Sequence, residues 1–221
     1  MKQTALLFDL DGTLVDSVPD LAAAANRLLA ELGHAPLDPR EVAGMVGDGV
    51  AKLVERVLAA RGAPEIAADA ALRRFVALYE ANAATLTRPY PGVAAGLEAL
   101  AARGVRFAIC TNKIEQATRL VLEGVGLARF FPVMLCGDSL PTHKPDPGPC
   151  LAALARLGVP PEAAAMIGDH RNDVLAAHGA GVPAIFARYG YGLATLGGLR
   201  PDAMIDRFDE LPQALEVVSG R

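Results

Sequence analysis

The chain carries two kinds of hydrophobic pattern, and the change between them falls near residue 90. A short continuous apolar run at 5–8 predicts a buried strand near the N-terminus. In the segment 17–88, apolar residues recur at helical spacing, which predicts that nearly all of it is helical. The clearest example places five residues at positions i, i+3, i+4, i+7 and i+8: Val50, Leu53, Val54, Val57 and Leu58.

Start and stop signals divide this helical segment. The run 17–20 resembles a capping box with a proline in the first turn, and Gly33 marks the end of that helix. The run 38–41 repeats the start signal, and Gly62 ends the amphipathic helix. Prolines within 88–92 then interrupt any helix.

From residue 93 onward, short apolar runs alternate with helical segments, which predicts a parallel sheet with helices on both faces. The first strand is expected to join this sheet. We therefore predict an α/β fold with a Rossmann-like parallel sheet core and an inserted α-helical cap. The expected core is 1–15 and 92–221, with 16–91 forming the cap and its linkers. The four expected strands after the insert are 107–110, 133–136, 165–167 and 184–186.

Composition narrows the function classes. The 221 residues contain no apolar stretch near the ~20 residues of a membrane span, and the N-terminus runs straight into the first strand. A cytoplasmic protein without membrane contact is expected. The net charge is -4, with no basic block and no tryptophan, so nucleic-acid binding is not indicated. Cys110, Cys136 and Cys150 have neither disulfide-set nor metal-site spacing and are interpreted as small buried hydrophobes.

The first strand ends in Asp9 and Asp11, which would face the same side of an extended chain. Two ionised carboxylates roughly 4 Å apart repel by about 4 kcal/mol at an effective dielectric near 20, so the pair needs a cation, a shared proton or water. Gly12 allows a tight turn close to a ligand, and Thr13 adds a hydroxyl. The alternative is ordinary Asp-Gly turn chemistry, with Asp11 as a helix cap.

Polar groups follow the later strands as well, where ligands bind in open parallel sheets. Thr111 and Asn112 follow one strand, Lys144 lies beyond the next, and Asp169 and Asp173 follow a third. Taken singly, they fit a helix cap, a solvated loop lysine and a turn. Their occurrence at successive strand ends favours one shared site.

These residues resemble the motifs of the haloacid dehalogenase superfamily of phosphohydrolases. The run 9–13 matches the first motif, Thr111 the second, Lys144 the third and 168–173 the fourth. The runs at 111–113, 144–147, 168–173 and 189–192 resemble the phosphoglycolate phosphatase branch. The resemblance extends over the whole chain, including the helical insert.

The resemblance implies a Mg²⁺-dependent phosphate monoester hydrolase acting on a small phosphorylated metabolite, with 2-phosphoglycolate as the expected substrate. A sugar-phosphate phosphatase, phosphomutase, phosphonate-cleaving enzyme or pyrophosphatase remains an alternative, as does a non-catalytic binding protein of the same fold. A dehalogenase would not need Asp11. A monomer or a homodimer is compatible with the sequence.

The resemblance also implies residue roles. Asp9 would attack phosphorus to form an aspartyl phosphate, and Asp11 would serve as general acid and then general base. Mg²⁺ would bind the Asp9 side chain, the Asp11 backbone carbonyl and the Asp169 side chain. Lys144 would neutralise charge while Asp173 holds it in place. The residues implied in phosphate binding are Leu10, Gly12, Thr111, Asn112 and Lys144.

Substrate choice is expected to lie in the cap. The glycine-rich stretch around 44–50 suggests a mobile loop, and a nearby cation could meet a substrate carboxylate. We predict contacts from Gly47, Asp48, Gly49 and Lys52, although Lys52 also fits a solvated helix face. His170 occupies a position where relatives often have a small residue, and we expect it to tune the surroundings of the metal or to contact the cap.

Overall fold

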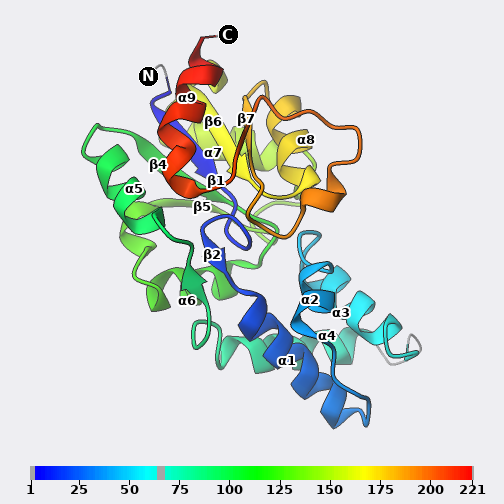
Figure 1. Ribbon diagram of the computed structural model, residues 1–221. Helices are drawn as coiled ribbons and strands as arrows, with labels where there is room; N and C mark the ends of the chain where they lie inside the picture. The colour runs from blue at the N-terminus through cyan, green and yellow to red at the C-terminus, as the bar shows by residue number, and fades with distance from the viewer. Residues whose placement is uncertain (1–2, 64–67, 221) are drawn as a thin grey trace.

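The computed structural model describes residues 3–63 and 68–220. It shows a sheet flanked by helices, with a group of further helices below it (Figure 1). The six strands of this sheet are β1 (Ala5–Phe8), β4 (Arg106–Cys110), β5 (Val133–Leu135), β6 (Ala164–Gly168), β7 (Ala184–Ala187) and β8 (Ala203–Ile205). Every pairing is parallel, in the order β5-β4-β1-β6-β7-β8, which confirms the predicted core. The edge strand β8 was not predicted from the sequence.

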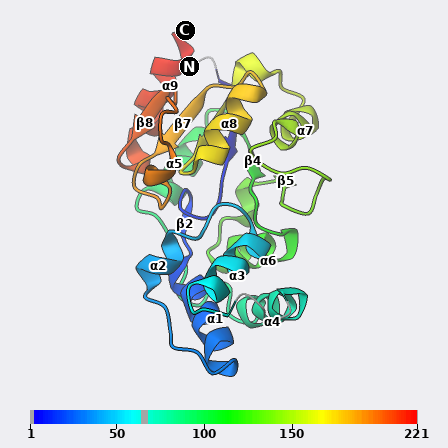
Figure 2. The same cartoon turned by 90° about the vertical axis from the view of Figure 1, so that its right-hand side faces the viewer.

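Helices cover both faces of the sheet (Figure 2). Alternate residues of β1 enter different clusters, with Leu6 and Phe8 on one side and Ala5 and Leu7 on the other. The first side packs against α5 (Val93–Ala101), α6 (Glu115–Gly124) and α9 (Leu211–Ser219), and the second against α7 (Gly148–Leu157) and α8 (Arg171–Gly179). Because β1 is buried from both sides, the residues that follow it are held in a fixed position.

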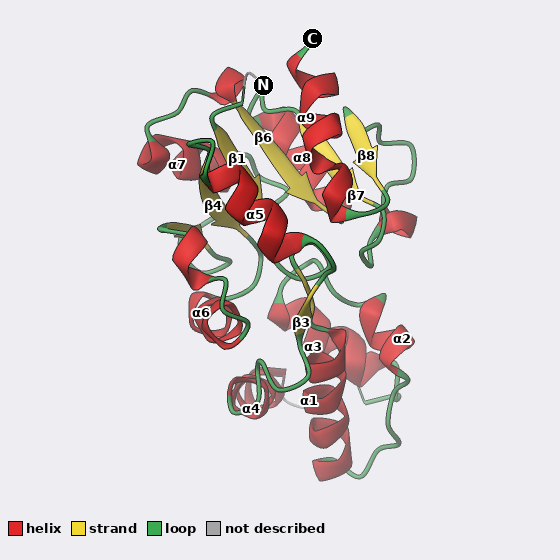
Figure 3. Ribbon diagram, turned by 60° about the vertical axis from the view of Figure 1, so that its left-hand side comes forward, coloured by secondary structure: helices red, strands yellow, loops and turns green. Residues whose placement is uncertain are grey.

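The predicted helical segment forms a separate group below the sheet, here called the helical insert (Figure 3). It consists of α1 (Val18–Glu31), α2 (Pro39–Ala43), α3 (Val50–Ala59) and α4 (Ala68–Glu80). Two short antiparallel strands, β2 (Val15–Asp16) and β3 (Arg88–Pro89), pair where the chain enters and leaves it. We propose on this basis the division into 1–15 with 92–221 and 16–91; residues 1–2, 64–67 and 221 lie outside the described part.

One of the two predicted capping boxes is present. Asp38 accepts a hydrogen bond from the N–H of Arg40, and Glu41 accepts one from the N–H of Asp38. The prediction for Ser17 was wrong, because its backbone is near-helical and its side chain makes no capping bond. The Asp20 carboxylate of the same run is used elsewhere, accepting the N–H groups of residues 86 and 87.

The structure also bears on the cysteines and on the expectation of no membrane span. The three cysteines are free and buried, as predicted. Within 3–63 and 68–220, no helix combines the length and the apolar character that crossing a membrane requires.

Candidate active site

Asp9 and Asp11 lie at the carboxyl end of β1, where the chain turns sharply. The Leu10 carbonyl accepts hydrogen bonds from the backbone N–H groups three, four and five positions later. Gly12 has a φ of 83°, in the left-handed region that favours glycine. A Cβ at Gly12 would lie 2.3 Å from the Asp169 carboxylate. The glycine therefore lets the carboxylate after β6 approach the turn after β1.

Lys144 links two of the predicted carboxylates. It lies in the loop between β5 and α7, and only 2% of it is exposed. Its ammonium donates to Oδ1 of Asp9 at 3.0 Å and to Oδ1 of Asp173. Burial lowers the pKa of Lys144, but the two carboxylates outweigh burial, so the pKa is raised and the ammonium remains charged.

Asp169 follows β6 and is fixed by donors on both of its oxygens. Oδ2 accepts the backbone N–H groups of Tyr191 at 2.7 Å and Gly192 at 3.2 Å. Oδ1 accepts the hydroxyl of Thr13 at 3.3 Å. The carboxylate is therefore oriented by the loop after β7 and by the turn after β1.

We call Asp9, Asp169, Asp173 and Lys144 the floor of the site. Burial is the largest cause that raises the pKa of Asp9 to about 6, even though Lys144 opposes it. Burial and repulsion from the other two carboxylates raise the pKa of Asp169 well above its usual value. The floor is therefore crowded with negative charge.

Asp11 has a different cation. Both oxygens of its carboxylate accept from the ammonium of Lys113 at 3.0 Å, and the two side chains are 12% and 7% exposed. The same ammonium lies 4.5 Å from the centroid of the Tyr79 ring, on α4 of the helical insert. The two aspartates that the sequence places two residues apart thus pair with two different lysines.

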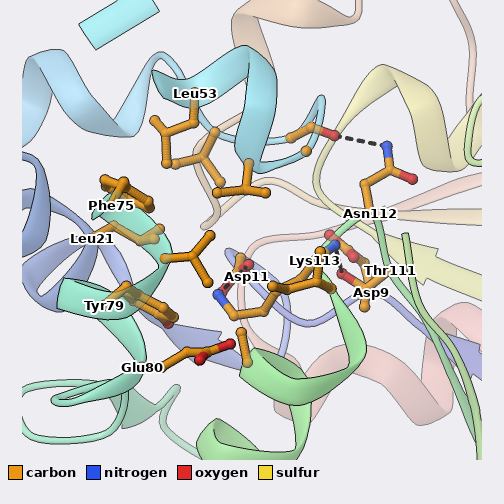
Figure 4. A pocket seen from close by; sticks show the side chains of 17 residues that line it. Asp9, Asp11, Leu21, Leu53, Phe75, Tyr79, Glu80, Thr111, Asn112 and Lys113 are labelled. Carbon is orange, nitrogen blue, oxygen red and sulfur yellow. Dashed lines mark hydrogen bonds and ion pairs between the residues drawn. The ribbon is translucent and has the colours of Figure 1, made fainter. Parts of the chain in front are cut away.

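A cavity that is partly open to solvent lies between the strand ends and the helical insert. Asp9, Asp11 and Thr111 line it from the sheet side (Figure 4). We call the apolar side chains that face them from the insert the wall: Leu21, Leu53, Phe75 and Tyr79. Charged groups on one side of the cavity therefore face a largely apolar surface on the other.

Thr111 and Asn112 follow β4 and both line the cavity. Thr111 Oγ1 accepts the backbone N–H of Lys113 at 3.3 Å. The Asn112 side chain donates to the carbonyls of Lys144 at 2.9 Å and Gly47 at 3.0 Å. Asn112 thus ties the lysine loop and the helical insert to the end of β4.

The loop between α2 and α3 contacts the core through polar groups. Gly47 and Gly49 line the cavity. Asn172 at the start of α8 donates to Asp48 Oδ1 at 2.7 Å and to the Gly47 carbonyl at 3.3 Å. Together with the bond from Asn112, these contacts hold the loop over the strand ends.

Lys52 lies away from this cavity. Its ammonium pairs with Glu55 at 2.7 Å, and about half of its side chain is exposed. Arg56, four residues on, binds Asp48 and the carbonyl of Met45. The structure therefore places Lys52 on the solvated side of α3, and its predicted contact with substrate stays a prediction.

His170 caps α8, a role that its residue type did not suggest. Its Nδ1 accepts the N–H of Asn172 at 3.3 Å, and Asp173 accepts the N–H of His170 at 2.9 Å. A Cβ at Gly47 would lie 2.5 Å from the imidazole ring, so the ring packs against the loop of the helical insert. Burial lowers the pKa of His170, which favours the neutral ring.

The model of the haloacid dehalogenase-like hydrolase family matches residues 6–187. The chain belongs to this family. A phosphoglycolate phosphatase of Rhodospirillum rubrum is 45% identical over 94% of this chain and 88% of its own length. A second, from Neisseria meningitidis, is 42% identical over 96% and 93%. This hydrolase is therefore a phosphoric monoester hydrolase of the phosphoglycolate phosphatase type.

A solved structure supports the same relationship. The crystal structure of a predicted phosphoglycolate phosphatase from Haemophilus somnus superposes with a TM-score of 0.91 at 32% identity, covering 97% of this chain and 99% of that one. The agreement over almost the full length shows that the sheet and the helical insert are arranged alike in the two proteins.

The residues of this hydrolase fit the Mg²⁺ that the resemblance implies. Ligand atoms of Asp9, Asp169 and Asp173 lie within 4.8 Å of one another. With Asp11, four carboxylates meet only two lysine ammonium groups among the described residues, which leaves a deficit of two positive charges. A divalent cation with hard oxygen ligands matches both the deficit and the donors.

The sequence reasoning missed the two side chains that shape the other half of the cavity. In the sequence, Lys113 stands out only as part of the run 111–113, and Tyr79 only as part of the predicted helical segment 17–88. The signal for Lys113 was its place one residue beyond Asn112 at a strand end. Nothing in the sequence pairs it with a tyrosine 34 positions earlier, because that contact exists only when α4 packs over the sheet.

Proposed function

We propose that this hydrolase converts 2-phosphoglycolate to glycolate and phosphate, with Mg²⁺, through a phosphorylated Asp9. The observation that carries the proposal is the Asp9 carboxylate, held by Lys144 and open to a cavity that Asp11 also lines. The choice of substrate rests on the relatives named phosphoglycolate phosphatase. The same cavity is partly open to solvent, so a substrate can reach both aspartates.

In the first step, an Asp9 oxygen forms a bond to phosphorus while the bond from phosphorus to the ester oxygen breaks. Asp11, which must be protonated in the substrate complex, gives its proton to that leaving oxygen, so glycolate departs with a hydroxyl group. The ammonium of Lys144 neutralises charge on Asp9 and on the phosphoryl group. Asp173 keeps the ammonium aimed at them.

In the second step, Asp11 takes a proton from a water molecule. The water oxygen bonds to phosphorus, the bond to Asp9 breaks, and phosphate leaves. One carboxyl group thus serves as acid and then as base, which restores the starting state of both aspartates. Thr111 and the backbone near Leu10, Gly12 and Asn112 would hold the phosphoryl oxygens.

Mg²⁺ would be held by the side chains of Asp9 and Asp169 and by the Asp11 carbonyl. When bound, it supplies charge neutralisation and orientation to the phosphoryl group. The contacts of Asp48 with Asn172 keep the helical insert over the site, which limits the access of bulk water. The cytoplasmic location and the monomeric or homodimeric state stay predictions.

The test is phosphate release from 2-phosphoglycolate and a panel of sugar phosphates, with and without Mg²⁺, using Asp9→Asn protein as the blank. We expect Mg²⁺-dependent turnover with a strong preference for 2-phosphoglycolate. A preference for a sugar phosphate would retain the mechanism and overturn the substrate. No phosphate release from any ester would overturn both.

A further inference from the structure

Lys113 is a buried cation of the cavity that the proposed mechanism does not use. Its side chain runs from the end of β4 across the cavity toward Asp11 and Tyr79 (Figure 4). It is the sole cationic side chain among the described residues that line the cavity. The charged residues that share the lining are all acidic: Asp9, Asp11 and Glu80. An anionic group that enters beside the phosphate therefore has one cation to meet.

The position of Lys113 is fixed from two sides. Asp11 binds its ammonium through both carboxylate oxygens, and the face of Tyr79 lies 4.5 Å away. An aromatic face holds a cation by its quadrupole, most strongly when water is excluded. Tyr79 is 3% exposed and stacks on Phe75 at 6.3 Å, so the ring cannot easily move away. Removal of one anionic partner thus leaves the ammonium in place.

The stereochemistry of the proposed substrate brings an anion to this point. The ester oxygen must reach Asp11 in order to receive a proton. In 2-phosphoglycolate the carboxylate carbon is two covalent bonds from that oxygen. Because Lys113 lies 3.0 Å from Asp11, a substrate whose ester oxygen contacts Asp11 carries its carboxylate next to the ammonium. A substrate with a neutral group there would meet Lys113 still bound to Asp11.

We propose that Lys113 is the specificity residue of this hydrolase: it takes the substrate carboxylate in exchange for Asp11, and the exchange frees Asp11 to act on the ester oxygen. The inference rests on the proposed function and names the substrate class, a phosphate ester with a carboxylate two bonds from the ester oxygen. Binding energy from a group remote from phosphorus then contributes to the chemical step, as expected when an interaction favours the transition state.

The exchange accounts both for acceptance of a substrate with a carboxylate and for rejection of a substrate with a neutral group in its place. A carboxylate replaces Asp11 at the ammonium with little change in charge balance, so the buried cation is never left alone. A neutral substituent gives the ammonium no new partner, and Asp11 stays held by two hydrogen bonds. The exposed Lys52, paired with Glu55 outside the cavity, offers no such exchange.

The test compares two esters that differ at one group, 2-phosphoglycolate and 2-hydroxyethyl phosphate, in which a hydroxymethyl group replaces the carboxylate. Lys113→Met should lower kcat/KM for 2-phosphoglycolate by roughly 10- to 150-fold, the range of a lost hydrogen bond to a charged group. It should not lower kcat/KM for the neutral ester, because Asp11 is then free without an exchange. Lys113→Arg should restore part of the selectivity. Arg119→Met removes an exposed charge on α6 and should change neither ester.

Equal losses on the two esters would overturn the inference, because they would mean that Lys113 merely supports Asp11. Unchanged selectivity in both Lys113 variants would overturn it as well. Near-UV circular dichroism of each variant separates these outcomes from misfolding, and Lys113→Arg keeps the charge if Lys113→Met does not fold.

A binding experiment separates this inference from the proposed function. Calorimetric titration of Asp9→Asn protein with each ester, with and without Lys113→Met, reports recognition without turnover. We expect the second substitution to weaken binding of 2-phosphoglycolate at least tenfold and to leave the neutral ester within threefold. If wild-type protein hydrolyses neither ester, the proposed function fails while this titration still decides the role of Lys113. Equal binding of 2-phosphoglycolate by the two proteins would overturn the inference.

Discussion

Two buried lysines of the site lie in opposite surroundings, one on the floor and the other packed against the wall. On the floor, Lys144 lies between two carboxylates and is almost inaccessible. Against the wall, Lys113 lies between one carboxylate and an aromatic face and lines the open space. The first lysine has no freedom to change partners, whereas the second has one partner that a substrate can replace. The fixed charge of Lys144 suits binding of the phosphoryl group, whereas the exchangeable charge of Lys113 suits recognition of the substrate carboxylate.

The contrast follows from how the two regions are built. The floor is made of residues that lie beyond the ends of β1, β5 and β6, and the hydrogen-bonded pairing of the sheet sets their spacing. The wall belongs to helices that are joined to the sheet by two linkers and a few side-chain contacts. Variants in the two regions should therefore fail in different ways.

The largest effect is expected at the floor, from Asp9→Asn. An amide cannot form the proposed phosphorylated intermediate, so turnover of 2-phosphoglycolate should fall by at least about 10⁴-fold. Phosphate release measures it, with Asp69→Asn on the exposed start of α4 as the matched control. Residual activity above a few per cent would contradict covalent catalysis.

Lys144→Met tests the difference between the lysines through stability. It leaves two buried carboxylates without a cation, and we expect a loss of about 3 to 5 kcal/mol in the free energy of unfolding. Lys113→Met leaves only the partly exposed Asp11 and should cost less than half as much. Urea unfolding measures both, with the exposed Lys52→Met within about 0.5 kcal/mol of wild type. Equal losses for the two buried lysines would remove the distinction.

The crowding of carboxylates on the floor predicts a response to Mg²⁺. Asp169→Asn removes one buried charge and keeps an oxygen for the N–H groups of Tyr191 and Gly192. In chelator it should be more stable than wild type by about 1 to 2 kcal/mol. Added Mg²⁺ should raise the Tm of wild type and have little effect on the variant. Scanning calorimetry decides, and an equal Tm rise in both proteins would exclude Asp169 as a ligand.

The smallest effect is expected where the two regions meet. Asn172→Ala removes the hydrogen bonds to Asp48 and to the Gly47 carbonyl. We expect this to cost about 1 kcal/mol of the free energy that holds the helical insert against the core. The KM for 2-phosphoglycolate should rise about fivefold while kcat stays within twofold. Steady-state kinetics on both esters checks this. A large fall in kcat would show instead that Asn172 supports the floor.

Much of the floor was predictable from the sequence. Asp9 and Asp169 follow strands, Lys144 lies in the loop beyond one, and Asp173 lies in the first turn of the next helix. Parallel strands bring such positions to one edge. The tight turn at Gly12 was predictable for the same local reason. Ser17 shows the limit of such signals, since its capping pattern is present while its backbone geometry removes the cap.

The sequence by itself determined the parallel sheet, the helical insert and the chemical identity of the floor, because these depend on local periodicity and on where strands end. Only the tertiary structure decided which lysine pairs with which aspartate, that Lys52 faces solvent, and that Tyr79 covers Lys113. Those contacts join segments up to 135 positions apart. Local pattern carries no information about such pairs, because they form only when the strands assemble into the sheet and the insert packs over the strand ends.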